Sequence, residues 1–269
     1  MGESEEIIAF GRTAELMSYG EQRVLKLFRS GLPANLAEEE FRISMAVYQS
    51  GLSVPQPFEM LERDGRTGIV YEKAAGMTMI AALARDPGIV EAEGQRMARL
   101  HAEIHRCRVE GLPRQKAALA HKITEAKLLS EDETRRITAG MDLLEDEGFL
   151  CHGDYHPDNI ILGEKEWIID WMTAMTGSPK ADVARTLLLL RTGTLPEELP
   201  PPVQELFARL RENLTIAYLQ EYMKLSGITY TEIENWLVPV AAARLVEWIP
   251  EPEKAQLVKL IRERLQERP

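Results

Sequence analysis

His152-Gly153-Asp154-Tyr155-His156-Pro157-Asp158-Asn159 is the most informative stretch of this 269-residue chain. An apolar run over 148–151 precedes it, and Ile160–Leu162 follows it. Gly153 and Pro157 disfavour regular secondary structure, so the sequence predicts a loop between two strands. Ionisable side chains crowded on such a loop are costly for folding and useful for chemistry. The stretch therefore indicates a catalytic loop.

A second polar position lies beyond this loop, where the predicted strand Trp167–Ile169 ends in Asp170. Kinases use one aspartate to orient the acceptor hydroxyl, and an asparagine and a second aspartate to hold magnesium. We expect Asp154 to orient and deprotonate a hydroxyl group. Asn159 and Asp170 supply the hard oxygen ligands that Mg²⁺ prefers. The spacing therefore predicts phosphoryl transfer.

Lys26 interrupts the apolar strand Val24–Phe28 and points away from its apolar neighbours. In a chain that also carries the loop described above, this ammonium is expected to reach the α- and β-phosphates of a nucleotide. Such a lysine needs a carboxylate partner. Glu40 shares a helical stripe with apolar positions 36, 43 and 47, so it is the predicted partner, with Glu39 as the alternative.

The turn Gly11-Arg12-Thr13-Ala14 lies between the first two predicted strands. Its backbone N–H groups, at Gly11 and Thr13, are expected to fold over nucleotide phosphates. The turn contains a single glycine, and many β-turns share this composition.

The sequence predicts an α+β fold with two lobes. Residues 1–73 are mostly strand with one helix over about 36–50, and a hairpin turns at Asp64-Gly65. Residues 74–269 are mostly helical, with the catalytic loop and a hairpin over 149–170. The helices predicted there run from Asp86 to about Cys107, from Ser130 to about Glu147, and from Pro179 to the end, with breaks at Leu199–Pro202 and Pro250–Pro252.

Composition excludes several classes of protein. The chain is 45% hydrophobic, which is enough for a full core. No apolar run approaches the roughly 20 residues that span a bilayer, and the acidic N-terminus differs from a secretory signal. Two cysteines are too few for a disulfide framework, so a cytoplasmic location and no membrane partner are expected. A net charge of −11 argues against nucleic-acid binding, and it suits either a cationic acceptor or solubility alone.

Histidines offer a competing interpretation. His152, Asp154, His156 and Asp158 recur at steps of two, which could align metal ligands on an extended segment. His101 and His105 have a zinc-compatible spacing on a helix. However, His101 shares a stripe with apolar residues, so we expect a buried structural histidine. His152 and His156 are expected to hold the loop by hydrogen bonds.

Taken together, these residues resemble the aminoglycoside phosphotransferase and choline kinase-like family, small-molecule relatives of the protein kinases. The stretch His152–Asn159 is similar to the catalytic loop of that family, and Ile169-Asp170-Trp171 is similar to its metal-binding motif. The Lys26 strand resembles its phosphate-anchoring strand. Further similarities are Gly51–Pro55, Tyr71–Lys73, Leu100-His101 and Pro179–Ala184, so the resemblance runs from about Ile7 to Arg191.

This resemblance implies a protein-kinase-like fold, with a nucleotide-binding lobe over 1–73, a catalytic and acceptor-binding lobe over 74–269, and a hinge near 71–76. It implies ATP or GTP as the phosphoryl donor, with Mg²⁺ as cofactor. Backbone atoms at Glu72 and Lys73 would contact the base. The tail beyond residue 200, including 236–248, would line the binding site of a small-molecule acceptor of aminoglycoside, choline or sugar type.

Two alternatives stay open from the sequence. The sparse glycines of the first turn, and Met172 after Trp171, are compatible with a nucleotide-binding regulatory module that does not catalyse. A metal-dependent hydrolase would use the histidines and aspartates of the loop. The sequence does not specify the oligomeric state.

Overall fold

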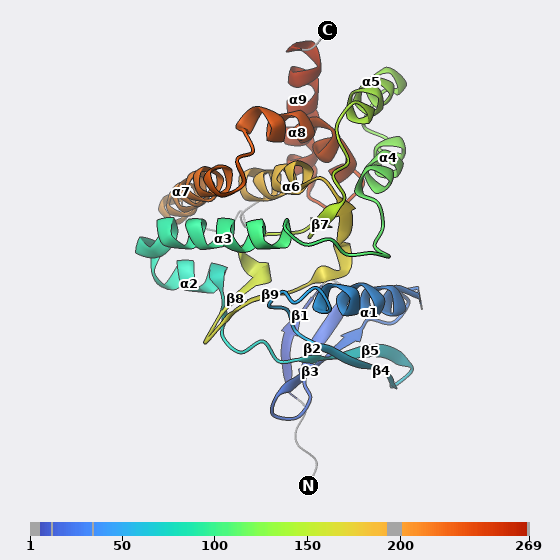
Figure 1. The fold of residues 1–269 in the computed structure, drawn as a ribbon, viewed down its shortest axis with the longest axis vertical. Coiled ribbons are helices and arrows are strands. Elements are labelled where there is room, and N and C mark those ends of the chain that lie inside the picture. Colours follow the sequence, from blue (N-terminus) through green and yellow to red (C-terminus); the bar gives the residue numbers. More distant parts are fainter. Residues whose placement is uncertain (1–5, 12, 34, 193–200, 268–269) are drawn as a thin grey trace.

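The computed structural model describes residues 6–11, 13–33, 35–192 and 201–267, which form two lobes (Figure 1). The smaller lobe is an antiparallel sheet in the order β1-β2-β3-β5-β4 with one helix against it. Its elements are β1 (Ile7–Phe10), β2 (Ala14–Ser18), β3 (Arg23–Phe28), α1 (Asn35–Tyr48), β4 (Pro57–Arg63) and β5 (Arg66–Glu72).

Strand β3 alternates between two apolar clusters. Leu25 and Leu27 pack with Val70 on one face of the sheet. Phe28 lies with Ile69 on the other face, which α1 covers. This alternation confirms the predicted direction of the Lys26 side chain, because consecutive residues of a strand face opposite sides.

The predicted hairpin is also present. Asp64 and Gly65 have φ values of 49° and 69°, and they join β4 to β5. A two-residue hairpin turn of this kind needs positive φ at both central positions, which Asp and Gly tolerate. The Asp-Gly pair is a local signal, so this hairpin could be predicted from the sequence.

The larger lobe is mainly helical, with short strands that carry the loops. Strands β6, β8 and β9 form one small sheet and β7 pairs with β10. The elements are β6 (Met77–Thr78), α2 (Met79–Arg85), η1 (Pro87–Ile89), α3 (Val90–Ile104), α4 (Gln115–Glu125), α5 (Glu131–Asp142), β7 (Phe149–Cys151), η2 (Pro157–Asn159), β8 (Ile160–Leu162), β9 (Glu166–Ile168), η3 (Trp171–Thr173), β10 (Met175–Gly177), α6 (Pro179–Thr192), α7 (Pro201–Ser226), α8 (Tyr230–Arg244) and α9 (Glu251–Glu267).

Several helices differ from the predicted ones. Helices α2 and α4 were not predicted, and the segment after Asp86 begins as η1 before α3. Helix α5 ends at Asp142, short of the predicted Glu147. The residues that follow Asp142 are not helical, and the side chain of Glu147 accepts a hydrogen bond from the hydroxyl of Ser178. The predicted break at Leu199–Pro202 lies partly outside the described residues, and Pro201 begins α7.

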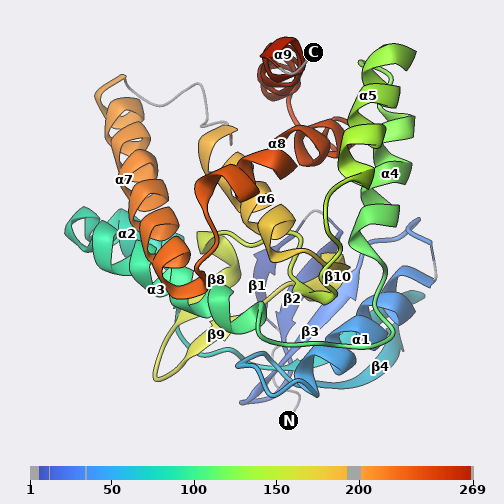
Figure 2. The same ribbon diagram turned by 45° about the horizontal axis from the view of Figure 1, so that its top comes forward.

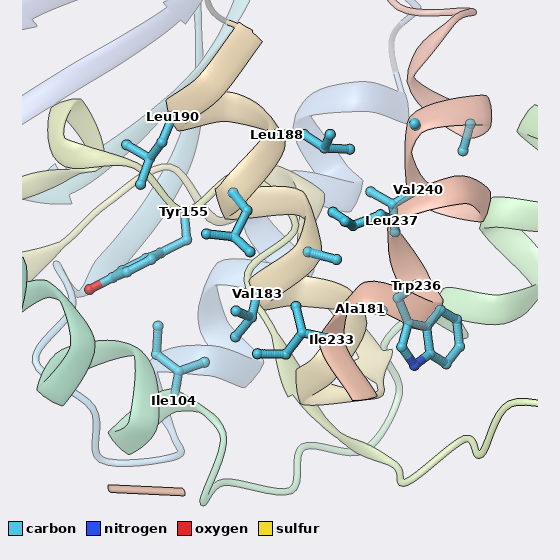
Figure 3. Close-up of a cluster of buried hydrophobic side chains, with 14 of the residues drawn as sticks. Ile104, Tyr155, Ala181, Val183, Leu188, Leu190, Ile233, Trp236, Leu237 and Val240 are labelled. Atoms are coloured by element: carbon cyan, nitrogen blue, oxygen red, sulfur yellow. The ribbon is translucent and has the colours of Figure 1, made fainter. Parts of the chain in front are cut away.

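The main core lies between α3, α6, α7 and α8. Helices α3 and α7 run side by side, and α6 packs against α8 (Figure 2). Figure 3 shows part of this core, in which Val183 and Leu188 of α6 lie near Ile233 and Leu237 of α8. Trp236 is only 1% exposed. Trp236 therefore belongs to the core. The resemblance implied that it would line the acceptor-binding site, and its burial contradicts that expectation. Within the described part of the chain, no helix has the length and apolarity needed to cross a bilayer.

Helix α9 is attached to α8 by a buried ion pair. The Nε and Nη2 atoms of Arg244 lie 2.9 and 2.6 Å from Oε1 of Glu253, and both side chains are buried. Removing one member of a buried pair leaves the other charge without compensation. This contact therefore stabilises the attachment of α9.

We expect Glu253→Gln to lower the free energy of unfolding by about 3 kcal/mol, since Arg244 keeps only its contact to Glu247. Urea denaturation measures the change. The control is Glu263→Gln, because Glu263 is exposed on α9 and lies 3.8 Å from Lys259. That substitution should change stability by no more than about 0.5 kcal/mol. Equal losses in both variants would contradict a stabilising role for the buried pair.

Candidate active site

Lys26 joins carboxylates from the two lobes. Its Nζ lies 2.7 Å from Oε1 of Glu40 and 3.2 Å from Oδ1 of Asp170. Burial alone would lower the pKa of Lys26, but the charges of Asp170 and Glu40 outweigh it and raise the pKa above its ordinary value. The lysine is therefore a fixed cation between α1 and the segment that follows β9.

The inward direction of Glu40 follows from the helical stripe. Glu40 is 3% exposed, and Tyr71 donates a hydrogen bond of 3.1 Å to its Oε1. The alternative residue, Glu39, pairs with Arg42 on the exposed side of α1 instead. The structure thus brings together Lys26 and Glu40, the pair that the sequence predicted.

Asn159 and Asp170 lie next to each other because β8 and β9 form a hairpin. The amide of Ile169 donates a 3.0 Å hydrogen bond to the carbonyl of Asn159. Asp170 then adopts a left-handed conformation, with φ of 63°, which turns the chain away from the strand. Its side chain is 40% exposed, so it faces accessible space.

The donor set fits a magnesium ion. The amide nitrogen of Asn159 donates a 2.8 Å hydrogen bond to the carbonyl of Asp154, which leaves its side-chain oxygen for a cation. Asp170 offers a carboxylate. Two oxygen ligands of this kind, completed by water and phosphate, are the usual protein contribution to a Mg²⁺ site.

Asp154 lies between two basic groups. Its Oδ2 is 3.5 Å from Nε2 of His156, and its Oδ1 is 3.5 Å from Nη2 of Arg185. Burial alone would raise the pKa of Asp154, but His156 and Arg185 hold the pKa well below its usual range. The side chain is therefore a carboxylate, as a group that orients a hydroxyl must be.

The backbone of the catalytic loop is held by one buried carboxylate. Asp182 of α6 accepts hydrogen bonds from the amides of His152 and Gly153, at 2.6 and 2.8 Å. Gly153 has a φ of 78°, and a side chain there would approach the carbonyl of Thr173 to 2.5 Å. Only glycine meets both demands, so the loop depends on this residue.

The same carboxylate organises two histidines. Nε2 of His101 and Nε2 of His105 lie 3.1 and 3.2 Å from Oδ2 of Asp182. Their Nδ1 atoms lie 2.7 Å from the hydroxyls of Tyr218 and Tyr222. Neutral histidines that donate to the aspartate and accept from the tyrosines satisfy every one of these groups. The buried structural histidine predicted at position 101 is therefore present.

The metal-hydrolase interpretation loses its ligands in this arrangement. Nε2 of His152 lies 3.0 Å from the carbonyl of Ile169, and Nδ1 accepts from the amide of Asp154. His156 accepts from the backbone at Asp158 through its Nδ1. Among the residues that the structure describes, the one group of three such side chains close enough to share an ion is His101, His105 and Asp182. No loop histidine or aspartate belongs to it.

Several backbone groups of the predicted hinge and first turn are already hydrogen-bonded within the protein. The amide of Glu72 donates to the carbonyl of Gln56, and the amide of Lys73 donates to the carbonyl of Gln22, so these two N–H groups are not available to a nucleotide base. In the first turn the amide of Gly11 donates to Ala14, and the carbonyl of Thr13 accepts from Arg29. Arg12 lies outside the described residues.

Two residues of the site were missed in the sequence. Arg185 of α6 contacts Asp154, and Glu247, after α8, holds Arg185. Asp182 lies in the stretch Pro179–Ala184 that resembles the family, but the sequence indicates no role for it. A charged residue at position 185, within the apolar run of a buried helix, was the one available signal.

A family model and several solved structures match this chain. A model of the family described as "Phosphotransferase enzyme family" matches residues 12–227. The structure of an aminoglycoside-3′-phosphotransferase of type VIII has a TM-score of 0.62 at 18% identity, covering 89% of this chain and 93% of that one. A thermostable mutant of an aminoglycoside phosphotransferase, in a ternary complex with ADP and hygromycin B, has a TM-score of 0.66 at 12% identity, covering 97% and 92%.

A third structure, the GDP complex of a mutant aminoglycoside 2′-phosphotransferase, has a TM-score of 0.55 at 17% identity, covering 97% of this chain and 91% of that one. At these identities the structural likeness shows the fold, which is the kinase-like fold that the sequence predicted. A search of curated protein sequences finds no match.

The buried histidine network predicts a pH dependence of stability. Burial, together with the neighbouring His105, lowers the pKa of His101 to about 3. Below about pH 6.5 the unfolded chain therefore binds a proton at His101 that the folded protein does not bind. The contribution of His101 to stability is fully present above that pH. As the pH falls from there to about 3, stability decreases by up to roughly 1.4 kcal/mol per pH unit.

Urea denaturation of the wild type and His101→Gln between pH 7 and pH 4.5 tests this expectation. The variant should be less stable at pH 7 and show a shallower decline, by about one proton. His121→Gln is the control, since His121 is exposed on α4. If the wild type and His101→Gln lose stability in parallel, the buried neutral histidine is not the cause.

Proposed function

The chain belongs to the phosphotransferase enzyme family, and we propose that it transfers the γ-phosphate of ATP or GTP to a hydroxyl group of a small molecule. The observation that carries this proposal is the contact of Lys26 with both Glu40 and Asp170. Lys26 and Asp170 are 144 positions apart in the sequence. A structural role alone does not require an ammonium between two carboxylates at the junction of two lobes.

Each side chain has a role in this proposal. Lys26, fixed by Glu40, would neutralise charge on the α- and β-phosphates, and the first turn, around Thr13, would lie over them. The N–H group of Gly11 would not contribute, because it already donates to the carbonyl of Ala14. Asn159 and Asp170 would hold Mg²⁺. The ion would neutralise the charge that develops on the β- and γ-phosphate oxygens.

Asp154 would accept a hydrogen bond from the acceptor hydroxyl and align its oxygen with the γ-phosphorus. In the transfer, that oxygen forms the new bond to phosphorus while the bond to the β-phosphate oxygen breaks. The nucleoside diphosphate leaves, and the hydroxyl proton passes to Asp154. A carboxylate with a low pKa suits alignment better than early proton abstraction, in keeping with a loose transition state.

The acceptor is a small hydroxyl compound of aminoglycoside, choline or sugar type in this proposal. Support comes from one of the similar structures, which holds hygromycin B together with ADP. The contact of Lys26 with Glu40 and Asp170 supports an active enzyme over a catalytically silent nucleotide-binding module, because such a module would not need all of these charged groups.

We expect Asp154→Asn to lower phosphate transfer by about 10²- to 10⁴-fold, because the hydroxyl loses the group that orients it and accepts its proton. Nucleotide binding should persist, since Asp154 does not contact Lys26 or Asp170 in the structure. Radiolabelled transfer from ATP and GTP to a panel of hydroxyl acceptors measures the loss. The control is Asp158→Asn, an exposed carboxylate of the same loop. Undiminished transfer by Asp154→Asn would refute the assigned role.

Nucleotide binding is a separate expectation. With Mg²⁺, ATP or GTP at one hundred times Kd should raise the melting temperature by about 5 to 10 °C. Lys26→Met and Asp170→Asn should lose most of this shift, whereas Lys259→Met, a change on exposed α9, should keep it. Differential scanning fluorimetry with and without EDTA measures the effect. An unchanged shift in Lys26→Met would place the phosphates elsewhere.

A further inference from the structure

Arg185 is a partly buried cation in the middle of helix α6, and its side chain is 14% exposed. We propose that Arg185 is a positioning residue that fixes the carboxylate of Asp154 for the acceptor, and that Glu247 holds Arg185 in place from the opposite side. This inference rests on the function proposed above. It concerns residues that lie outside the predicted nucleotide and metal sites.

The contacts of Arg185 use the whole guanidinium group. Nε donates to the carbonyl of Gly153 at 3.0 Å, and Nη2 lies 3.5 Å from Oδ1 of Asp154. Nη1 and Nη2 donate to the two carboxylate oxygens of Glu247, at 2.7 and 3.0 Å. A planar fork that makes two parallel bonds to one carboxylate has its orientation fixed by that carboxylate. Glu247 therefore determines where the remaining edge of the guanidinium points.

The backbone of the loop has other anchors besides the bond from Arg185 to the carbonyl of Gly153. Asp182 already receives the amides of His152 and Gly153, and Thr173 donates a 3.0 Å hydrogen bond to the carbonyl of His152. The partly buried ion pair of Arg185 and Glu247 gives little net stability, because desolvation offsets much of the attraction. The distinctive contribution of Arg185 is its approach to the Asp154 side chain, which none of these other groups contacts.

Arg185 and His156 hold the Asp154 carboxylate from two sides, one near each oxygen. A carboxylate fixed in this way loses rotamer freedom before the acceptor arrives. Correct orientation of a reacting group contributes strongly to rate, and small misplacements cost a large factor. The acceptor hydroxyl therefore meets a carboxylate whose direction is set in advance.

Glu247 connects this arrangement to the surrounding helices. It accepts from Arg244 of α8 at 2.8 Å, and Lys122 of α4 lies 3.5 Å from its Oε1. Burial alone would raise the pKa of Glu247, but Arg185, Lys122 and Arg244 lower it below its usual value. Glu247 is thus a charged anchor between α4, α6 and α8. The position of Asp154 depends on how these helices sit around the site.

Four variants test the proposal: Arg185→Lys, Arg185→Ala, Glu247→Gln and the control Arg191→Leu. Arg191 is exposed in the last turn of the same helix. Lysine keeps the charge and lacks the fork, so Arg185→Lys should lower kcat by about 10- to 100-fold while the Kd for Mg·ATP stays within about twofold. Glu247→Gln should lower kcat in the same direction, and Arg191→Leu should not. Methylguanidine should restore part of the activity of Arg185→Ala and none of the activity of Asp154→Asn.

Hydrogen exchange of the amides in 152–156 provides a readout that needs no acceptor. Exchange should be faster in Arg185→Lys than in the wild type and in Arg191→Leu. A kcat for Arg185→Lys within threefold of the wild type, or unchanged exchange in that segment, would overturn the positioning role. A wild type that transfers no phosphate to any acceptor or to water would overturn the proposed function instead, and the exchange measurement would then show only whether Arg185 holds the loop.

Discussion

An ammonium held between two carboxylates is the contact on which the site depends. Lys26 comes from the sheet of the smaller lobe, Glu40 from the helix packed on that sheet, and Asp170 from the larger lobe. Each of the two carboxylates raises the pKa of the lysine against the effect of burial. In the proposed function, this fixed cation would set where the phosphates of a nucleotide lie, and the side chains of the larger lobe would act beyond that point.

The larger lobe holds its catalytic loop through a second buried charge. Asp182 is fully buried and receives hydrogen bonds from two loop amides and two histidines. Burial alone would raise its pKa, but His101 and His105 hold the pKa well below its usual range. Tyr218 and Tyr222 of α7 complete the hydrogen bonds of those histidines. The position of the loop is therefore set by the packing of α3, α6 and α7 around one carboxylate. The geometry of the loop and the stability of the core are therefore coupled at Asp182.

Much of the site could be predicted from sequence because its signals are local. Asp154 and Asn159 lie on one short loop, and the direction of Lys26 follows from the alternation of a strand. The role of Arg185 could not be predicted, because it depends on Glu247, which lies 62 residues away and reaches it only after α6 and α8 have packed together. Trp236 was misplaced for a related reason: its burial is decided by the approach of α6 to α8. Contacts across helices are set by packing, and a periodic pattern does not specify the partner.

A structure of the protein with Mg²⁺ and a non-hydrolysable ATP or GTP analogue tests the central claim most directly. The account predicts the α- and β-phosphates at the ammonium of Lys26, the metal on the side-chain oxygens of Asn159 and Asp170, and the γ-phosphate facing Asp154. A nucleotide bound away from Lys26, or a metal bound without Asp170, would contradict it.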